Sequence, residues 1–179
     1  EPRAKYNPGL PGFRADVRVP GPRTHSDALQ VIRLNQGTSQ RRPCEVRALH
    51  APRGWYNRGV ARVYLETSFF SACVSTRKTP KSVGWRVTSN EWWRALAPKH
   101  TLLISDEVVA ELADSEFPGR DAALEMLRGL QLLELTPDVR DVAELFVLEK
   151  LMPAPAVSGD AIHAAVATVH RVDFLVTWN

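Results

Sequence analysis

The stretch Ala61-Arg62-Val63-Tyr64-Leu65-Glu66-Thr67-Ser68 joins a short apolar run to an acid and two hydroxyl residues. The apolar run is typical of a buried strand, and the polar residues after it are typical of a turn into a helix. Similar runs lie at 101–104, 132–135 and 173–177, with helical patterns between them. Strands that alternate with helices predict an α/β fold with a parallel sheet covered on both faces.

Two helix starts are clear in the sequence between these strands. Thr136-Pro137-Asp138 places proline directly after a capping residue, and Ser105 is a good cap for the helix that follows it. Residues 76–84 are polar, contain Pro80 and Gly84, and predict a flexible loop. The expected helices cover residues 69–75, 85–96, 105–113, 119–130, 136–151 and 160–170.

Acids follow strands or open helices at one end of the predicted sheet. Glu66 follows the first strand, Glu111 lies on the helix after the second, Asp160 opens the last helix, and Asn179 follows the last strand. Carboxylates at such positions converge where open α/β sheets bind ligands. Hard oxygen ligands suit Mg²⁺ or Mn²⁺. The sequence therefore indicates a metal-dependent enzyme that acts on phosphate esters.

The acids also have structural interpretations, which stay open at this point. Glu66 and Asp160 would both stabilise a helix start, and Glu111 could be a solvent-facing acid whose place Glu107 takes. His163 is expected to be packed or to support a ligand residue, because no His or Cys stands at zinc spacing.

Other polar and aromatic residues near these acids have expected supporting roles. Thr67, Ser68 and Thr177 are expected to hydrogen-bond the carboxylates or bound waters. Trp92 and Trp93 lie on an amphipathic segment, so we expect them in core packing or a partner interface rather than in base stacking.

Residues 1–60 differ from the rest of the chain. They hold eleven Lys and Arg against four Asp and Glu, a net charge of +7, which leaves −4 for residues 61–179 of a chain whose total is +3. Seven prolines and six glycines, with little apolar content, predict a disordered leader. One interpretation is an arm that binds nucleic acid through phosphate contacts.

The interpretation that we favour makes residues 1–60 a mis-annotated upstream extension, because the first methionine is Met126 and a start near Val60 or Val63 would put the first strand at the N-terminus. Two cysteines without metal-ligand spacing make a disulfide framework unexpected and favour a reducing cytoplasm. No apolar run is long enough to cross a membrane, no signal peptide is evident, and no glycine-rich phosphate loop occurs.

The order of motifs in residues 61–179 resembles the PIN-domain family, and within it the VapC-type toxins of toxin–antitoxin pairs. The resemblance rests on Glu66-Thr67-Ser68 after a strand, on Ser105-x-x-Val108-x-x-Glu111, on Asp160-Ala-x-His163, and on the closing Leu-Val-Thr-Trp-Asn. Glu66 stands where many members carry Asp. The chain stops at Asn179 where members continue, so we expect a C-terminally truncated PIN-like domain.

The resemblance implies an α/β/α sandwich with a parallel four- to five-stranded sheet and an endoribonuclease that leaves a 5′-phosphate. It places Glu66, Glu111, Asp160 and Asn179 on family metal and catalytic positions. It also implies an RNA substrate, a cognate antitoxin whose segment covers the acidic groove, and a homodimer.

Two other functions compete with the nuclease. A non-catalytic PIN-like module would bind RNA or protein without metal dependence. A phospho-accepting receiver domain also clusters acids at strand ends, but receivers need paired acids after the first strand and a lysine after a late strand. Here Thr67 follows Glu66 and the last strand lacks lysine, so the receiver is disfavoured.

Overall fold

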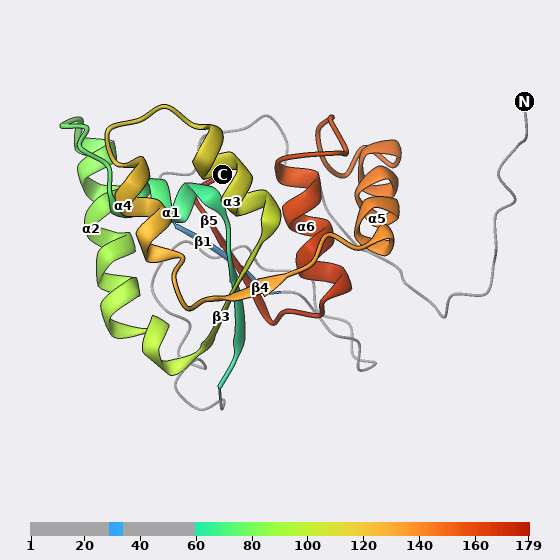
Figure 1. Ribbon diagram of the computed structural model, residues 1–179, viewed down its shortest axis with the longest axis horizontal. Helices are drawn as coiled ribbons and strands as arrows, with labels where there is room; N and C mark the ends of the chain where they lie inside the picture. Colours follow the sequence, from blue (N-terminus) through green and yellow to red (C-terminus); the bar gives the residue numbers. More distant parts are fainter. Residues whose placement is uncertain (1–28, 34–59) are drawn as a thin grey trace, which may run out of the picture.

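A single mixed sheet forms the centre of the molecule in the computed structural model, which describes residues 29–33 and 60–179 (Figure 1). The strand order is β1-β5-β2-β3-β4. β2 pairs in parallel with β3 and β5, β3 pairs in parallel with β4, and β1 pairs antiparallel with β5. The strands are β1 (Gln30–Arg33), β2 (Arg62–Leu65), β3 (Thr101–Ser105), β4 (Gln131–Leu133) and β5 (Phe174–Thr177).

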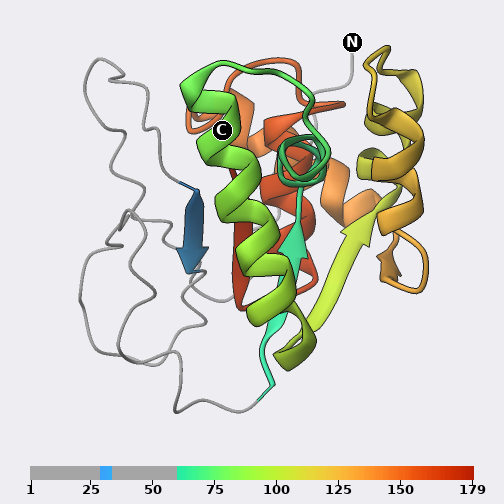
Figure 2. The same ribbon diagram turned by 90° about the vertical axis from the view of Figure 1, so that its left-hand side faces the viewer.

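Helices cover both faces of the sheet, which confirms the predicted α/β architecture. Figure 2 shows α1 and α2 on the near side of the strands and α5 and α6 on the far side. The helices are α1 (Thr67–Cys73), α2 (Pro80–Ala95), α3 (Asp106–Asp114), α4 (Arg120–Met126), α5 (Pro137–Leu148) and α6 (Asp160–Val169), with a 3₁₀ turn, η2, at Ala97–Lys99.

The start of α2 corrects one sequence prediction. Residues 80–84 were expected in a loop, but the helix begins at Pro80, because the Thr79 side chain accepts a hydrogen bond from the Ser82 amide at 3.2 Å. Proline at the first helical position needs no amide partner there. The polar residues that predict a loop instead form the solvent-facing first turn of α2.

Two predicted caps also differ from the structure. Ser105 occupies the N-cap position of α3, yet its side chain makes no capping bond. It faces the interior and lies 2.7 Å from the Tyr64 hydroxyl. At α6 the cap position belongs to Gly159, and Asp160 is the first helical residue.

The edge strand β1 comes from the segment that the sequence predicts to be a disordered leader. Gln30–Arg33 pairs along β5 with Val31 opposite Val176, and Leu29 is fully buried. The pairing supplies hydrogen-bond partners to an edge of β5 that would otherwise expose its backbone groups. Residues 1–28 and 34–59, where the rest of that prediction falls, lie outside the described residues.

The core lies between the sheet and its two helix layers. The largest fully buried side chains include Tyr64 and Leu65 of β2, Phe69 and Phe70 of α1, and Leu103 of β3. Phe69 packs edge-on against Trp92 with ring centroids 5.3 Å apart, in agreement with the expected packing role of that tryptophan. In the described part of the chain, the helices are too short or too polar to cross a membrane.

Candidate functional site

The parallel register brings the ends of three strands to one edge of the sheet. Tyr64 of β2 lies opposite Leu103 of β3, and Leu65 lies opposite Val176 of β5. Glu66, the residue after β2, therefore lies beside the ends of β3 and β5. This edge carries the residues that the sequence predicts as a site.

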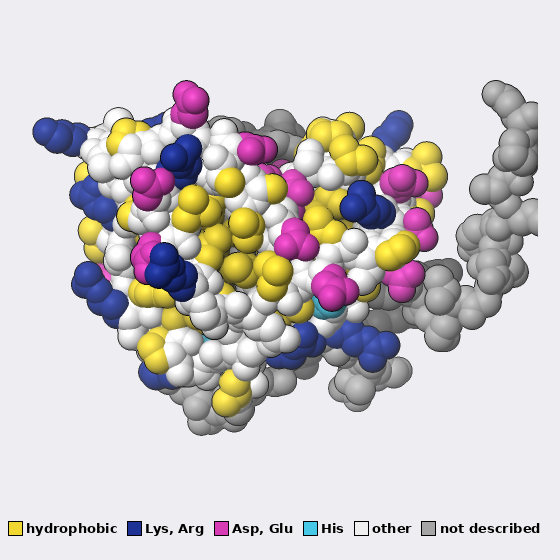
Figure 3. All heavy atoms as spheres, viewed as in Figure 1, with side chains coloured by type: hydrophobic (Ala, Val, Ile, Leu, Met, Phe, Trp, Pro, Cys, Tyr) yellow, Lys and Arg dark blue, Asp and Glu magenta, His cyan; other side chains and the backbone are white. Residues whose placement is uncertain are grey.

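A cleft of about 540 Å³ opens beside this edge, between α3 and the loop that leads into α6. In Figure 3, Asp and Glu side chains gather over the same region, between α3 and α6. Two of the four predicted ligands, Glu111 and Asp160, lie on its wall, whereas Glu66 and Asn179 do not. The other lining residues are Glu107, Ala110, Asp114, Pro153, Ala154, Pro155, Ser158 and Gly159.

Glu66 is tied to the first turn of α1. Its carboxylate accepts hydrogen bonds from the amide of Ser68 at 3.0 Å and from the Ser68 hydroxyl, and the residue is only 5% exposed. The Ser68 hydroxyl oxygen in turn accepts from the Trp178 amide at 2.8 Å. Glu66 thus caps the helix and connects it to the end of β5, as its structural interpretation anticipates.

Asp160 and Asn179 lie together at the exposed rim of the site. The side-chain amide of Asn179 donates to Oδ1 of Asp160 at 2.5 Å. The Asn179 backbone amide donates to the hydroxyl oxygen of Thr177 at 2.8 Å, so Thr177 holds the backbone that carries the Asn179 side chain. The structure therefore brings residues 19 positions apart into direct contact.

Glu111 is the end of a buried hydrogen-bonded row. Its Oε2 accepts from the hydroxyl of Thr67 and lies 3.0 Å from Nε2 of His163. The other ring nitrogen of His163, Nδ1, lies 2.8 Å from the Tyr64 hydroxyl, which lies 2.7 Å from Oγ of Ser105. The row runs from Ser105 at the end of β3, through Tyr64 of β2 and His163 of α6, to Glu111 at the cleft.

The electrostatics of this row favour an ionised Glu111. Burial alone would raise its pKa, but hydrogen bonds from His163 and Thr67 outweigh burial and lower the pKa. Burial likewise disfavours the charged form of His163, whereas its bond to Glu111 and the charges of Glu66, Glu111 and Glu107 raise its pKa. Burial raises the pKa of Tyr64, so its hydroxyl stays protonated.

Glu107 also belongs to this site. Its side chain is 8% exposed, lines the cleft, and accepts a hydrogen bond at 2.8 Å from the Gly159 amide. Gly159 has φ of 70° and ψ of −144°, a conformation open almost only to glycine. Glu107 therefore holds the turn that sets Asp160 on the cleft wall.

The donor types suit a divalent metal, although the side chains do not form a complete cage. Magnesium is commonly held by one or two carboxylates while water and phosphate oxygens complete its shell. Glu111 and Asp160, which line the same cleft, fit that pattern. Within residues 29–33 and 60–179, no three Asp, Glu, His or Cys side chains lie close enough together to hold a metal.

Sequence reasoning missed the role of Tyr64 and assigned Glu107 only as a substitute for Glu111. The signal for Tyr64 was present, because a tyrosine in a buried strand usually finds a partner for its hydroxyl. The role of Gly159 at the start of α6 was also missed, and its position directly before the helical acid Asp160 was the signal for it. No pattern in the sequence pointed to Pro153–Pro155 as cleft wall, because that loop contacts the site only through the fold.

Comparison with known proteins gives a likeness of fold. No protein-family model matches the chain, and no curated protein matches it. The crystal structure of VapC20 from Mycobacterium tuberculosis, a toxin that cleaves the sarcin–ricin loop, has a TM-score of 0.46 and 19% identity, over 62% of this chain and 84% of that chain. VapBC2 from Rickettsia felis, bound to a DNA fragment from the promoter, has a TM-score of 0.45 and 15% identity, over 62% and 83%. These values assign no activity to this chain.

Proposed function

We propose that this protein is a Mg²⁺- or Mn²⁺-dependent endoribonuclease. The observation that carries the proposal is the pair Glu111 and Asp160 on the wall of one open cleft at the carboxyl ends of parallel strands. Open α/β sheets bind ligands at this edge. The order of sequence motifs that resembles the PIN-domain family supports the choice of RNA.

The charge of the cleft supports a metal requirement. Glu107, Glu111, Asp114 and Asp160 all line it, so an anionic phosphate that entered alone would meet repulsion. A bound divalent cation reverses that local charge. Asp160 and Glu111 are the residues that would hold it, with Asn179 beside Asp160.

The metal, when bound, would activate water and neutralise charge on the scissile phosphate. The protein's own residues supply positioning. Thr67 and His163 hold the carboxylate of Glu111 in one orientation, and Asn179 does the same for Asp160. Glu66 would join the ligands only by exchanging its bonds to Ser68, which makes it the weakest of the four assignments.

The test is cleavage of a structured RNA mixture by the full chain, with Mg²⁺, with Mn²⁺ and with EDTA. Cleavage that requires metal and leaves 5′-phosphate ends would support the proposal. A folded protein that binds these RNAs without cutting them under any metal condition would contradict it.

A second candidate function is a non-catalytic PIN-like module that binds RNA or protein. One observation favours it: in the part of the chain that the structure describes, the carboxylates do not converge on a single metal position. RNA binding that is unaffected by EDTA, without any cleavage, would be its signature.

We further propose that the protein acts as the toxin of a toxin–antitoxin pair, works as a homodimer, and is inhibited by an antitoxin segment that covers the acidic cleft. The motif order is the support for these assignments. A small gene beside this one, whose product co-purifies with the protein and blocks cleavage, is the expected finding. Size-exclusion chromatography with light scattering tests the dimer.

A further inference from the structure

Positive charge in the described part of the chain gathers at α2 and the loop before it. Residues 76–100 hold six Lys and Arg and one Glu, a net charge of +5. Residues 101–179 hold five Lys and Arg and fourteen Asp and Glu, a net charge of −9. Figure 3 shows the basic side chains along the side of the molecule that α2 forms.

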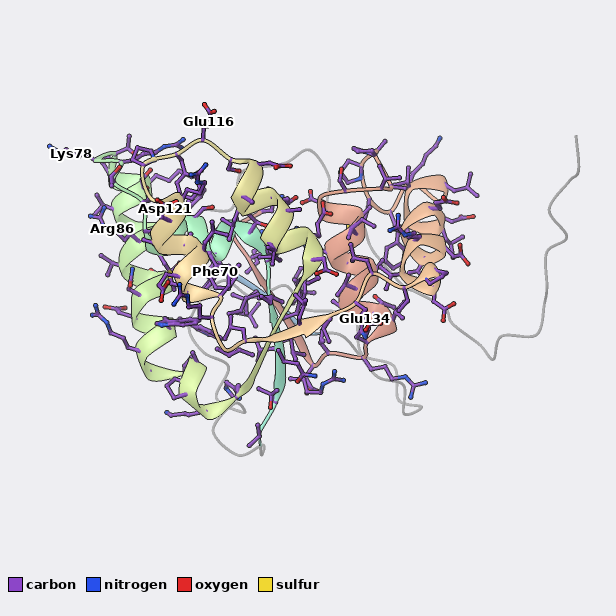
Figure 4. The ribbon with its side chains drawn as sticks, in the orientation of Figure 1. Phe70, Lys78, Arg86, Glu116, Asp121 and Glu134 are labelled. Carbon is purple, nitrogen blue, oxygen red and sulfur yellow. The ribbon has the colours of Figure 1, made fainter. Side chains whose placement is uncertain are left out.

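The start of α2 presents several of these cations to solvent. Arg77, Lys78 and Lys81 are all exposed. Arg86 is half-buried and donates to the Ser75 carbonyl at 2.6 Å, so it braces the loop that carries Arg77 and Lys78. In Figure 4, Lys78 and Arg86 lie on the same side of the molecule, and Lys78 points outward from the loop before α2.

A row of contacts links this basic end to the acidic site. The Lys81 ammonium lies 4.7 Å above the Trp85 ring, which stacks on Trp178 with centroids 4.9 Å apart. Trp178 directly precedes Asn179, whose amide donates to Asp160. The end of α2 that carries Lys81 is thus connected to Asp160 through two stacked tryptophans and Asn179.

We propose that Arg77, Lys78 and Lys81 form the surface that binds the phosphate backbone of the RNA whose scissile phosphate lies at the acidic cleft. The inference rests on the proposed nuclease function and adds the path of its substrate. An RNA strand carries a negative charge at every nucleotide, and an acidic site would repel the flanking phosphates. A cationic surface along the path of the strand compensates for that repulsion, because contacts of Lys and Arg with phosphate dominate non-specific affinity.

The test uses the full chain with Asp160→Asn and EDTA, so that RNA is bound without cleavage. Binding of a fluorescent single-stranded RNA is measured by anisotropy over a range of KCl concentrations. One variant carries Arg77→Gln, Lys78→Gln and Lys81→Gln. The matched control, Arg128→Gln, Arg140→Gln and Lys150→Gln, loses the same charge elsewhere on the described surface.

We expect RNA binding to depend less steeply on salt concentration in the first variant only. A plot of log K for RNA association against log[salt] has a negative slope, and each lost phosphate contact on a single strand makes it less steep by about 0.7. The loss of three contacts therefore makes it less steep by about 2. The control should keep the parental slope. An unchanged slope in the first variant, or an equal change in both, would overturn the proposal.

Hydrogen exchange separates this surface from the basic residues of the N-terminal 60 positions. RNA binding should protect amides between residues 76 and 86, and equal exchange there with and without RNA would overturn the proposal. Polyglutamate that competes as well as RNA would overturn the assignment to nucleic acid. Failure of the proposed nuclease function gives a different result: RNA that is bound through residues 76–86 but never cleaved would overturn the nuclease and the scissile phosphate at the cleft, and would support only the RNA-binding surface.

Discussion

Nε2 of His163 lies 3.0 Å from Oε2 of Glu111, and the same ring is held from the other side by the Tyr64 hydroxyl at 2.8 Å. A neutral imidazole donates to Glu111 and accepts from Tyr64, whose oxygen then accepts from Ser105. A protonated imidazole donates to both Glu111 and Tyr64, and the Tyr64 hydroxyl then donates to Ser105. Every polar atom of this row then has a partner. The position of Glu111 on the cleft wall therefore depends on a tyrosine of the central strand.

Removal of the Tyr64 hydroxyl should destabilise the fold. Tyr64→Phe keeps the ring in the core but leaves Oγ of Ser105 and Nδ1 of His163 without that partner. An unsatisfied buried polar group costs about 1–3 kcal/mol, and we expect a loss in that range by urea denaturation.

The control for this prediction is a double variant that combines Tyr64→Phe with Ser105→Ala, compared with the two single variants. Because the two side chains share one hydrogen bond, the double variant should lose less stability than the sum of the single variants. Strict additivity, or a loss below about 0.5 kcal/mol for Tyr64→Phe, would contradict the described row.

Two glycines should respond in opposite directions to alanine. Gly159→Ala forces a side chain into a backbone conformation with φ of 70° and should cost about 1–3 kcal/mol. Gly84 lies within α2 with no atom within 4 Å of an added Cβ, so Gly84→Ala should stabilise the protein by about 0.5–1 kcal/mol. Thermal unfolding measures both, and the same sign for both would be the contrary outcome.

Trp178 should contribute more to stability through packing than through its hydrogen bond. It is buried, stacks on Trp85 and donates from Nε1 to Oγ of Ser89 at 2.8 Å. Trp178→Ala should cost about 3–5 kcal/mol, as other large aromatic truncations in cores do. Ser89→Ala, which keeps the tryptophan ring and removes the hydrogen-bond partner that it shares with Cys73, should cost about 1–3 kcal/mol. A reversed order in urea denaturation would refute this assignment.

Cys73 should be unreactive in the native protein. Burial raises the pKa of its thiol to about 12, although a hydrogen bond with Ser89 opposes the shift. At pH 8 only about one thiol in ten thousand is then ionised, and the thiolate is the reactive species. In a Cys44→Ser chain, a thiol reagent should label the protein rapidly in denaturant and very slowly without it. Equal rates would show that the thiol is accessible.

The strand–helix order from β2 onward could be predicted from sequence because each of these strands belongs to a short apolar run that polar residues follow. The start of α2 could not, because the Thr79 cap and the Pro80 start lie in a segment whose composition also suits a loop. The strand β1 was missed for a different reason. Four residues of modest apolarity form a strand only because β5 offers them an edge.

The candidate site was partly accessible from sequence. The spacing placed Glu111 and Asp160 at one end of the sheet, and both line the same cleft. Their partners depend on side-chain directions that no spacing reveals. Glu66 bonds to Ser68, two residues away, and Tyr64 bonds to His163, which is distant in the sequence. In each case the sequence offers several polar groups that could be the partner.

The most direct test of the nuclease account is the rate of Mn²⁺-dependent RNA cleavage by the full chain and by Asp160→Asn. The matched control is Glu116→Gln, an exposed acid that projects from the loop between α3 and α4 in Figure 4. Circular dichroism and thermal unfolding establish that all three proteins fold alike. The account predicts at least a hundredfold loss for Asp160→Asn, on the order seen when one catalytic group is removed, and parental cleavage for Glu116→Gln. Equal cleavage by all three proteins would contradict the assignment of the acidic cleft as the site of hydrolysis.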